Sequence, residues 1–472
     1  MKTQHRFLGI LIAFIMSASC KKKDAATVET QLSVSSSAEL FTADGGMSEV
    51  TVTANSAWSV INTADWCSAN ATATNGNGKI SFTVQSNSTT SERAVTCSVA
   101  SGSISREIKI RQLGKVIPDS IAPDITGMSN DAVQLAARIR LGINIGNTLE
   151  AIGGETAWGN PAVTKELIDA IKQAGFNAVR IPCAWDQYAN QTTGKISDQW
   201  LDRVKQVVQY CIDDSLYAVL NIHWDGGWLE NNISAGAQSS VNAKQKAYWK
   251  QIAITMRGFD EHLLFAGANE PNANDAASMS VLLSYHQTFV NAVRSTGGRN
   301  TYRTLIVQGP STNIDYTSNL MNTLPADPTP RRMMAEVHYY EPFQFTALST
   351  DASWGNMFYY WGQDNHSAIE PARNATWGEE DFVVAEFPKM KAKFVDKGIP
   401  VIVGEYGAYR RTTPLDVDKH QRSVDHWITF VTQQQVANGL KPFWWDTGGL
   451  ISRSNYTVTD QRTLNAILLG AQ

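Results

Sequence analysis

Cysteine and surplus positive charge are both scarce in this sequence of 472 residues, and each scarcity excludes a class of protein. Only five cysteines are present, and neither a CxxC nor an HxxxH spacing occurs, so no metal site is recognisable. Lysine and arginine number 40 against 44 aspartates and glutamates, which leaves a net charge of −4 and no basic stripe to neutralise phosphates. We therefore expect no metal and no nucleic acid partner.

Long apolar runs are missing as well, since no stretch approaches the roughly 20 apolar residues that a membrane-spanning helix needs. The start of the chain has a shorter run, Phe7–Met16, which follows a basic end that contains Lys2 and Arg6. This pattern predicts a secretory signal peptide rather than a membrane helix.

The residues after this run bear on how the protein is exported. Ser17-Ala18-Ser19-Cys20 resembles a bacterial lipobox. The resemblance implies a signal peptide over residues 1–20, cleavage before Cys20 and acylation of the Cys20 sulfur. The mature protein would then be secreted and held by a lipid anchor in the bacterial outer membrane, at the cell surface or in the periplasm. Ordinary cleavage after a small residue, with a chance cysteine, is the alternative.

The remaining cysteines allow one disulfide within a single domain. Cys67 and Cys97 fall in the same candidate domain and could pair, because an exported protein can form disulfides. Cys183 follows Ile181-Pro182, and Cys211 lies in a helical pattern. For these two we expect small, buried, apolar side chains.

Residues 30–113 form the first candidate domain, which is rich in serine, threonine, valine and asparagine. Polar and apolar residues alternate there, as in Glu49–Thr53 and Lys79–Val84, and turn residues such as Asn75–Gly78 separate the runs. A period of two bounded by turns predicts short strands. We expect a small all-β sandwich of the immunoglobulin-like kind.

This domain resembles the BACON domain of Bacteroidetes carbohydrate enzymes. The resemblance rests on Trp58 and Trp66 after the first hairpin, Arg93 before a strand, and the closing run Ile108–Gln112. It implies either a carbohydrate-binding module or a spacer that holds an enzyme away from the membrane. We expect both tryptophans to lie in the core and assign no binding site to the domain.

Residues 114–130 contain Pro118 and Pro123, show no periodicity and predict a semi-rigid linker. From residue 131 to residue 472, apolar β-branched runs alternate with amphipathic helical stretches, which is typical of repeated βα units around a parallel sheet. The fold class expected here is α/β, a closed (β/α)₈ or TIM barrel. Its eight candidate strands are Leu141–Asn147, Ala178–Pro182, Ala218–His223, Leu263–Asn269, Thr304–Gln308, Met333–His338, Pro400–Glu405 and Pro442–Trp445.

Polar residues end nearly all of these apolar runs, and in parallel barrels the carboxyl ends of the strands carry the chemistry. Glu270 follows the fourth strand and Glu405 ends the seventh. Glycoside cleavage needs two such carboxyl groups, because one protonates the leaving oxygen while the other attacks the anomeric carbon or activates water. The two glutamates therefore predict a glycoside hydrolase site.

The motifs at the strand ends carry a second resemblance. In chain order they are Gly146-Asn147-Thr148-Leu149-Glu150, Val179-Arg180-Ile181-Pro182, Asn221-Ile222-His223-Trp224, Asn269-Glu270-Pro271, His338-Tyr339-Tyr340 and Gly404-Glu405-Tyr406-Gly407. With this set, the chain from Leu141 onward resembles glycoside hydrolase family 5, and most closely the endoglucanases and xyloglucanases of its subfamily four. Trp224 departs from the pattern, because many relatives carry a second histidine there. This departure puts contacts to the sugars of the minus subsites in doubt.

The resemblance implies a retaining mechanism with Glu270 as acid/base and Glu405 as nucleophile, their carboxyl groups roughly 5 to 5.5 Å apart. Desolvation and the nearby Glu405 should keep Glu270 protonated. Arg180 and Tyr340 should keep Glu405 ionised and aligned.

Four further side chains are expected to bind the substrate or support the site. Asn269 should contact the 2-hydroxyl of the sugar that is cut. His223 and His338 should hydrogen-bond sugar hydroxyls or brace the glutamates. Trp445 should stack under the −1 sugar, while Trp444 points away from it because the side chains of a strand alternate.

The chain has 14 tryptophans, and indole faces suit the apolar faces of sugar rings. We therefore expect a monomer that cuts β-glucan polysaccharides internally at β-1,4 linkages, including cellulose-type chains, mixed-linkage glucan and xyloglucan. Acid/base chemistry needs no cofactor. The segment Asp351–Asp381 should build part of the cleft. The expected aromatic rim consists of Trp158, Trp185, Trp224, Trp228, Trp354, Trp361 and Trp445, of which only some should contact sugar while the others pack between loop and barrel.

Two alternatives stay open at this point. A β-mannanase or a transglycosylase could use the same barrel, because preference for an axial or an equatorial 2-hydroxyl depends on loop geometry. A non-catalytic surface protein that binds glycans would also suit the aromatics, but it would not need both glutamates.

Overall fold

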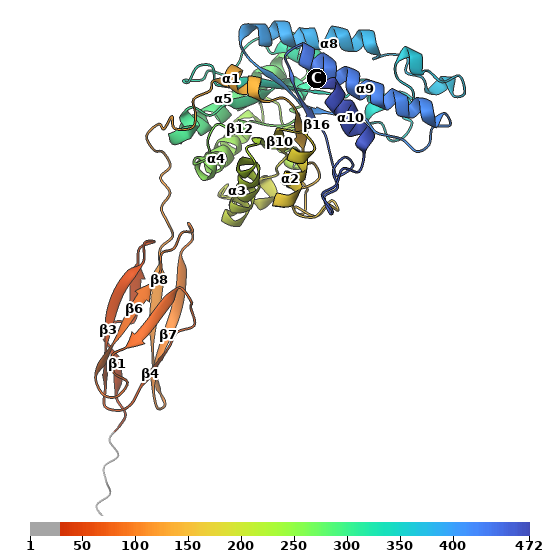
Figure 1. Ribbon diagram of the computed structural model, residues 1–472. Coiled ribbons are helices and arrows are strands. Elements are labelled where there is room, and N and C mark those ends of the chain that lie inside the picture. Colours follow the sequence, from red (N-terminus) through yellow and green to blue (C-terminus); the bar gives the residue numbers. More distant parts are fainter. Residues whose placement is uncertain (1–28) are drawn as a thin grey trace, which may run out of the picture. The chain divides into compact units, whose positions relative to one another are not determined.

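The structure, a computed structural model, describes residues 29–472, so the predicted signal peptide and Cys20 lie outside the described residues. The chain separates into two compact units, one up to Ile117 and one over Pro118–Gln472 (Figure 1). Among the described residues, no helix is both long enough and apolar enough to cross a membrane.

The first unit is a sandwich of two four-stranded sheets, with strand orders β1-β3-β6-β5 and β2-β8-β7-β4. All pairings are antiparallel except that of β2 with β8, which is parallel. The predicted small all-β sandwich is therefore confirmed. Its strands are β1 (Leu32–Val34), β2 (Ala38–Phe41), β3 (Gly46–Ala54), β4 (Ser59–Ile61), β5 (Cys67–Ala71), β6 (Gly78–Val84), β7 (Arg93–Ser101) and β8 (Ile104–Gln112).

The alternating residues of these strands form the core of the sandwich. Trp58 is buried in this core, and Trp66 packs against it with the guanidinium of Arg93 4.5 Å from the centre of its ring. Cys67 and Cys97 also lie in the core and are both free, so the possible disulfide is not formed. Trp58 therefore lies in the core as expected, whereas Trp66 is only partly buried at the edge of the core, with Arg93 over its ring.

The second unit is a closed barrel of eight parallel strands in the order β9 to β16, as the sequence predicts (Figure 1). Each observed strand overlaps one of the eight expected runs. The strands are β9 (Gly142–Asn144), β10 (Ala178–Ile181), β11 (Tyr217–Asn221), β12 (Leu263–Ala266), β13 (Leu305–Gln308), β14 (Met333–Tyr339), β15 (Val401–Tyr406) and β16 (Lys441–Trp444).

Helices surround the barrel strands (Figure 1). The α-helices are α1 (Ala132–Arg138), α2 (Lys165–Gln173), α3 (Asp198–Asp213), α4 (Gln238–Met256), α5 (Ala276–Arg294), α6 (Ile314–Leu320), α7 (Phe343–Thr346), α8 (Glu380–Lys393), α9 (Val417–Ala437) and α10 (Gln461–Gly470). Short 3₁₀ helices are η1 (Asp186–Tyr188), η2 (Asp225–Gly227), η3 (Gly298–Thr301), η4 (Pro310–Thr312), η5 (Gln363–Asn365), η6 (Pro371–Arg373) and η7 (Val395–Lys397).

The two faces of the barrel strands pack into different clusters. One set of alternating residues packs against the outer helices in the large core. The other set, which includes Ala178, Val219, Ile306, Met334 and Ile402, packs with α1. These residues form the apolar half of the barrel interior, near the amino ends of the strands. Two residues further along β10, β11, β13 and β14, the inward positions are polar, so polar side chains collect in the half of the interior near the carboxyl ends of the strands.

A register shift between β14 and β15 decides where Glu405 lies. Val337 pairs with Val403, but the next residue, His338, pairs with Glu405, so Gly404 is the extra residue of a bulge. Strict alternation from the inward Ile402 would place Glu405 on the outer face. The bulge shifts this alternation, as bulges next to active sites do, and sets Glu405 beside His338.

The separate cores of the two units lead to a stability prediction. Because each unit buries its own apolar cluster, each should unfold on its own. We expect calorimetry of the full chain to show two transitions. A truncated chain that begins at Lys115 should reproduce the barrel transition within about 2 °C. A loss of the barrel transition on truncation would show instead that the sandwich is needed for the barrel to fold.

Candidate active site

The guanidinium of Arg180 on β10 lies at the centre of the site and is fully buried. Its Nη1 donates to Glu405 Oε1 and to Asn144 Oδ1, both at 2.9 Å, and its Nη2 donates to Asn269 Oδ1 at 2.7 Å. Its Nε forms an ion pair of 2.9 Å with Glu336 Oε1. One side chain thus joins groups from β9, β14, β15 and the loop after β12.

Glu405 receives a donor on each of its oxygens. Arg180 binds Oε1, and the hydroxyl of Tyr340 donates to Oε2 at 3.2 Å. Burial raises the pKa of Glu405, while the positive charges of His338 and Arg180 act in the opposite direction. The two donors favour the carboxylate form, which is the form a nucleophile needs.

His223 also faces Glu405, with its Nε2 4.0 Å from Oε1. Burial lowers the pKa of this histidine far below the usual value, and the positive charges of Arg180 and His338 add to the effect. The imidazole is therefore neutral. The amide of Asn221 lies 3.3 Å from its Nδ1 and donates to it, which leaves Nε2–H directed toward Glu405.

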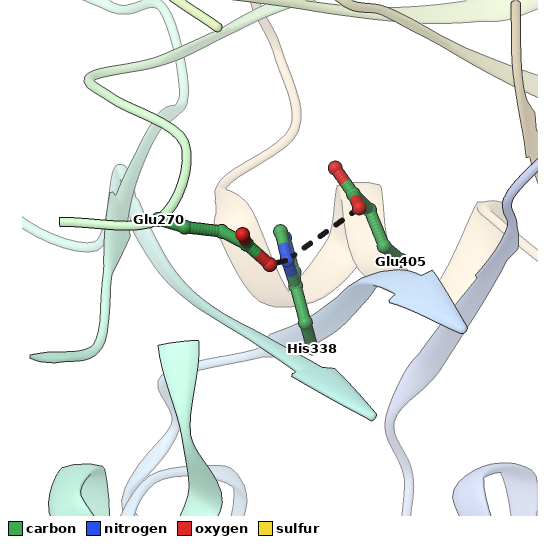
Figure 2. Close-up of side chains that lie close together, drawn as sticks. All are labelled: Glu270, His338 and Glu405. Carbon is green, nitrogen blue, oxygen red and sulfur yellow. Dashed lines mark hydrogen bonds and ion pairs between the residues drawn. The ribbon is translucent and has the colours of Figure 1, made fainter. Parts of the chain in front are cut away.

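Glu270 lies just beyond β12, and its side chain is 47% exposed, whereas that of Glu405 is only 8% exposed. Figure 2 shows the imidazole of His338 between the two carboxyl groups. The Nδ1 of His338 is 2.8 Å from Glu270 Oε1 and 3.8 Å from Glu405 Oε2. His338 thus lies within ion-pair distance of both glutamates.

The protonation of Glu270 differs from the expectation. Burial raises its pKa, but the hydrogen bond and the charge of His338 outweigh burial and bring the pKa below the usual value. Burial lowers the pKa of His338, yet Glu405, Glu270 and Glu336 together raise it to about 10. The expected desolvation is present, but these opposite pKa shifts favour a proton on His338 rather than on Glu270.

One ligand atom each from Glu270, His338 and Glu405 lies within 4.8 Å of the other two, a spacing that a metal ion could also use. A protonated imidazole has no free lone pair for a metal, and both of its ring nitrogens face carboxylates here. The cluster is therefore better explained as a network of ion pairs. Its two glutamates come close to the separation of about 5 to 5.5 Å that a retaining pair requires.

A cavity of about 510 Å³ opens beside these glutamates. It is lined from the segments that follow β14, β15 and β16 and by the start of α10, and it includes Phe343, Tyr409 and Trp445. The ring of Trp445 lies parallel to that of His223, with 5.6 Å between centres and 7° between planes. Trp444, which also contributes to the lining of the cavity, packs edge-on against Tyr406 in the large core.

The expected aromatic rim is partly wrong. Trp158, Trp224 and Trp354 are exposed, but Trp185 and Trp361 are fully buried. The indole N–H of Trp185 donates to the carbonyl of Asn221 and that of Trp361 donates to the carbonyl of Gly378, so both satisfy their polar group inside the protein. Trp228 is half-buried, with the ammonium of Lys244 5.3 Å from the centre of its ring.

The segment Asp351–Asp381 does not contribute to the lining of this cavity. Phe343, Thr346 and Ala347, just before this segment, line the cavity. Within the same region, the ring of Trp354 lies beside that of Phe343, with 6.4 Å between the ring centres.

Sequence reasoning missed two buried carboxyl groups. Glu336 occupies the inward position two residues before His338, and that spacing within one strand was the available signal. Glu230 lies in the loop after β11 with no comparable signal, and its Oε1 accepts the backbone N–H of Glu270 at 2.8 Å. Burial raises the pKa of Glu230 to about 8, the hydrogen bond from Glu270 opposes this, and the charges of Glu270 and Glu405 add to it.

A parallel (β/α)₈ barrel with two glutamates side by side at the carboxyl ends of its fourth and seventh strands has the architecture of a glycoside hydrolase. Comparison with known proteins specifies the family. Residues 144–449 match the profile of the cellulases of glycosyl hydrolase family 5, and residues 56–113 match BACON, a putative N-terminal binding domain. The chain belongs to glycosyl hydrolase family 5 and is a glycoside hydrolase of the endoglucanase type, as its motifs predict.

Its relatives include xyloglucanases. A xyloglucan-specific endo-β-1,4-glucanase of Bacteroides ovatus is 35% identical over 91% of this chain and 89% of its own length. A solved Bacteroides ovatus family 5 xyloglucanase in complex with a XXXG heptasaccharide has a TM-score of 0.70 and 33% identity, covering 94% of this chain and all of that chain. A solved broad-specificity subfamily 4 endoglucanase of Ruminococcus champanellensis with bound cellotriose has a TM-score of 0.63 and 30% identity. The match covers 72% of this chain and 98% of that chain.

The raised pKa of Glu230 leads to a prediction on stability. An unfolded glutamate ionises near pH 4.3, so between about pH 4 and pH 8 the folded chain keeps a proton that the unfolded chain has released. The contribution of Glu230 to stability therefore falls as the pH rises through this window. Glu230→Gln keeps an acceptor for the N–H of Glu270 but cannot titrate. The melting temperature of the variant minus that of the wild type should rise by on the order of a few degrees between pH 4.5 and pH 8.5.

The control is Glu166→Gln, at an exposed position in the first turn of α2. The backbone hydrogen bond at this helix start lowers the pKa of Glu166. The melting temperature of Glu166→Gln minus that of the wild type should therefore not rise with pH. A difference for Glu230→Gln that stays constant from pH 4.5 to pH 8.5 would contradict the prediction.

Proposed function

We propose that this protein is a retaining endo-β-1,4-glucanase in which Glu270 is the acid/base and Glu405 the nucleophile. The observation that supports this assignment best is the difference between their surroundings. Glu405 is buried with Arg180 and Tyr340 on its two oxygens, whereas Glu270 is half-exposed and faces the cavity. A fixed carboxylate suits attack on carbon, and an accessible carboxyl suits exchange of a proton with the leaving group and with water.

In the first step, Glu405 attacks the anomeric carbon while Glu270 protonates the leaving oxygen, and a glycosyl ester forms on Glu405. In the second step, the ionised Glu270 removes a proton from water, and the water oxygen displaces Glu405. We assign Asn269 to the 2-hydroxyl, because Arg180 fixes its amide oxygen and thereby turns its N–H₂ donor away from the guanidinium. Trp445 provides the stacking surface for the −1 sugar.

For the substrate, we propose β-1,4-linked glucan chains, with xyloglucan among those that are accepted. The relatives include xyloglucan-specific and broad-specificity endoglucanases. The cavity beside the catalytic pair offers about 510 Å³, and aromatic side chains line it. Stacking reads a ring face rather than individual hydroxyls, so it tolerates branches.

We further propose that the protein is exported, anchored by a lipid on Cys20 to the outer membrane and active as a monomer. Supporting the export proposal are the apolar run Phe7–Met16 and the lipobox-like residues that follow it. With Trp58 buried and Trp66 covered by Arg93, the sandwich suits a spacer better than a binding module.

Azide rescue tests the two catalytic roles. Glu405→Ala and Glu270→Ala should each lose at least about a thousandfold in activity on polymer, because each removes one required group. On an aryl glycoside with a good leaving group, azide should give the α-glycosyl azide with Glu405→Ala and the β-glycosyl azide with Glu270→Ala. Products can be distinguished by the proton coupling at the anomeric carbon. The same azide anomer from both variants would mean that the roles are wrongly assigned.

Product analysis tests the endo-acting mode and the substrate class. The viscosity of a soluble β-1,4-glucan should fall by half before about 5% of the reducing ends that complete digestion yields have appeared, because internal cuts shorten chains fastest. Carboxymethyl cellulose, mixed-linkage glucan, xyloglucan and mannan should be compared at equal concentration. Glucose as the main early product, or mannan cut faster than every glucan, would refute the endo-β-glucanase assignment.

A further inference from the structure

Glu336 is a fully buried carboxyl group that the mechanism above does not use. It stands on β14, in the half of the barrel interior near the carboxyl ends of the strands. Its Oε1 is 2.9 Å from Arg180 Nε and 3.3 Å from His338 Nε2, and its Oε2 accepts a hydrogen bond of 2.6 Å from Gln308. Glu336 therefore contacts both of the cationic side chains that hold the catalytic glutamates.

Gly404 leaves the space that Glu336 occupies. A Cβ atom at Gly404 would lie 1.9 Å from Glu336 Oε1, so any other residue there would displace the carboxylate. Gly404 is also the extra residue of the bulge that turns Glu405 inward. The same glycine thus makes room for Glu336 and positions the neighbouring Glu405.

We propose that Glu336 is a positioning residue that keeps a proton on His338, and that His338 passes this proton to Glu270 for delivery to the leaving oxygen. The inference rests on the proposed function, because it takes Glu270 to be the acid/base.

The electrostatics around His338 support this role. Four carboxyl groups surround it: Glu270 from the end of β12, Glu336 from β14, Glu405 from β15 and Glu230 from the loop after β11. Two basic side chains also face this cluster: Arg180, which is cationic, and His223, whose pKa is lowered by burial and by the charges of Arg180 and His338. With the pKa of His338 raised to about 10 and that of Glu270 lowered, the pair holds one proton at neutral pH, and it resides on the imidazole.

A general acid with a lowered pKa would be ionised at the pH of catalysis, which is the difficulty that the relay resolves. The Nδ1–H of His338 gives its proton to Glu270 Oε1 across the 2.8 Å hydrogen bond, and the N–H electron pair stays on Nδ1. Glu270 then donates a proton to the glycosidic oxygen, which takes the electron pair of the breaking C1–O bond while Glu405 bonds to C1. Net charge is conserved, because His338 loses its positive charge as Glu405 loses its negative charge.

The second half of the cycle restores the proton. Water gives a proton to the ionised Glu270 as its oxygen bonds to C1, and the ester bond to Glu405 breaks with its electron pair on the carboxylate. The proton then returns from Glu270 to His338 Nδ1. Glu336 makes this return favourable, because its charge stabilises the imidazolium through Nε2.

Glu336→Gln tests the proposal, since it removes the charge and keeps the size. The matched control is Glu386→Gln, a buried glutamate on α8 that pairs with Lys389 and has no contact with the catalytic pair. We expect the alkaline limb of the kcat/KM profile to move to lower pH by at least one unit in Glu336→Gln and to stay in place in the control. Glu336→Asp, which restores the charge, should move the limb back toward that of the wild type.

A measurement on the wild-type protein covers the case in which Glu336→Gln fails to fold. With ¹⁵N-labelled histidine, the ring nitrogens of His338, assigned by their loss in His338→Gln, should both carry a proton at pH 8. A neutral His338 at pH 8 would overturn the inference, as would an unshifted alkaline limb in a folded Glu336→Gln. Glu270→Ala, measured in parallel, distinguishes failure of this inference from failure of the proposed function. Full activity in Glu270→Ala would overturn the proposed function itself.

Discussion

The buried guanidinium of Arg180 is the interaction on which the rest of the site depends. A cation in the interior of a barrel is stable only if anions accompany it, and removing one partner of such a pair costs on the order of 3–5 kcal/mol. Arg180 has two anionic partners, Glu405 and Glu336, and it also fixes the amide oxygen of Asn269. The need to neutralise one charge therefore brings three strands and one loop to a common geometry. Substrate recognition and nucleophile alignment follow from the same contact.

The eight strands and most of the site could be predicted from the sequence. In a parallel barrel, an apolar run that ends in polar residues predicts a strand whose carboxyl end faces the active site. The orientation of Glu405 could not be predicted, since strict alternation would turn it outward and only the bulge at Gly404 corrects this. The spacing of Glu336 to His338 was a signal for Glu336, but it was not sufficient, because a glutamate inside an apolar run could equally face a helix. For both glutamates, the direction of the side chain depends on contacts between strands rather than on the residue pattern along one strand.

Protonation is where local reasoning from the sequence failed most clearly. Burial and a second carboxylate do raise the pKa of a glutamate, and both act on Glu270, but an imidazole 2.8 Å away reverses their sum. In such a cluster the relevant quantity is the number of protons shared by the group, rather than the pKa of one residue. Three glutamates, one arginine and one histidine share their charge here. The distribution within the cluster then depends on geometry that a bound sugar would alter.

The hydrogen bond of the indole N–H distinguishes the tryptophans that pack in the core from those that are available to a ligand. An indole that donates its N–H to a carbonyl in the interior, as Trp185 and Trp361 do, can be covered on both faces without leaving a polar group unsatisfied. Trp445 differs, because its ring lies parallel to that of His223 and the residue also lines the cavity. Support from one side and access from the other is what a sugar-binding platform requires. For that reason the parallel His223–Trp445 pair carries more weight for substrate binding than the number of tryptophans in the chain.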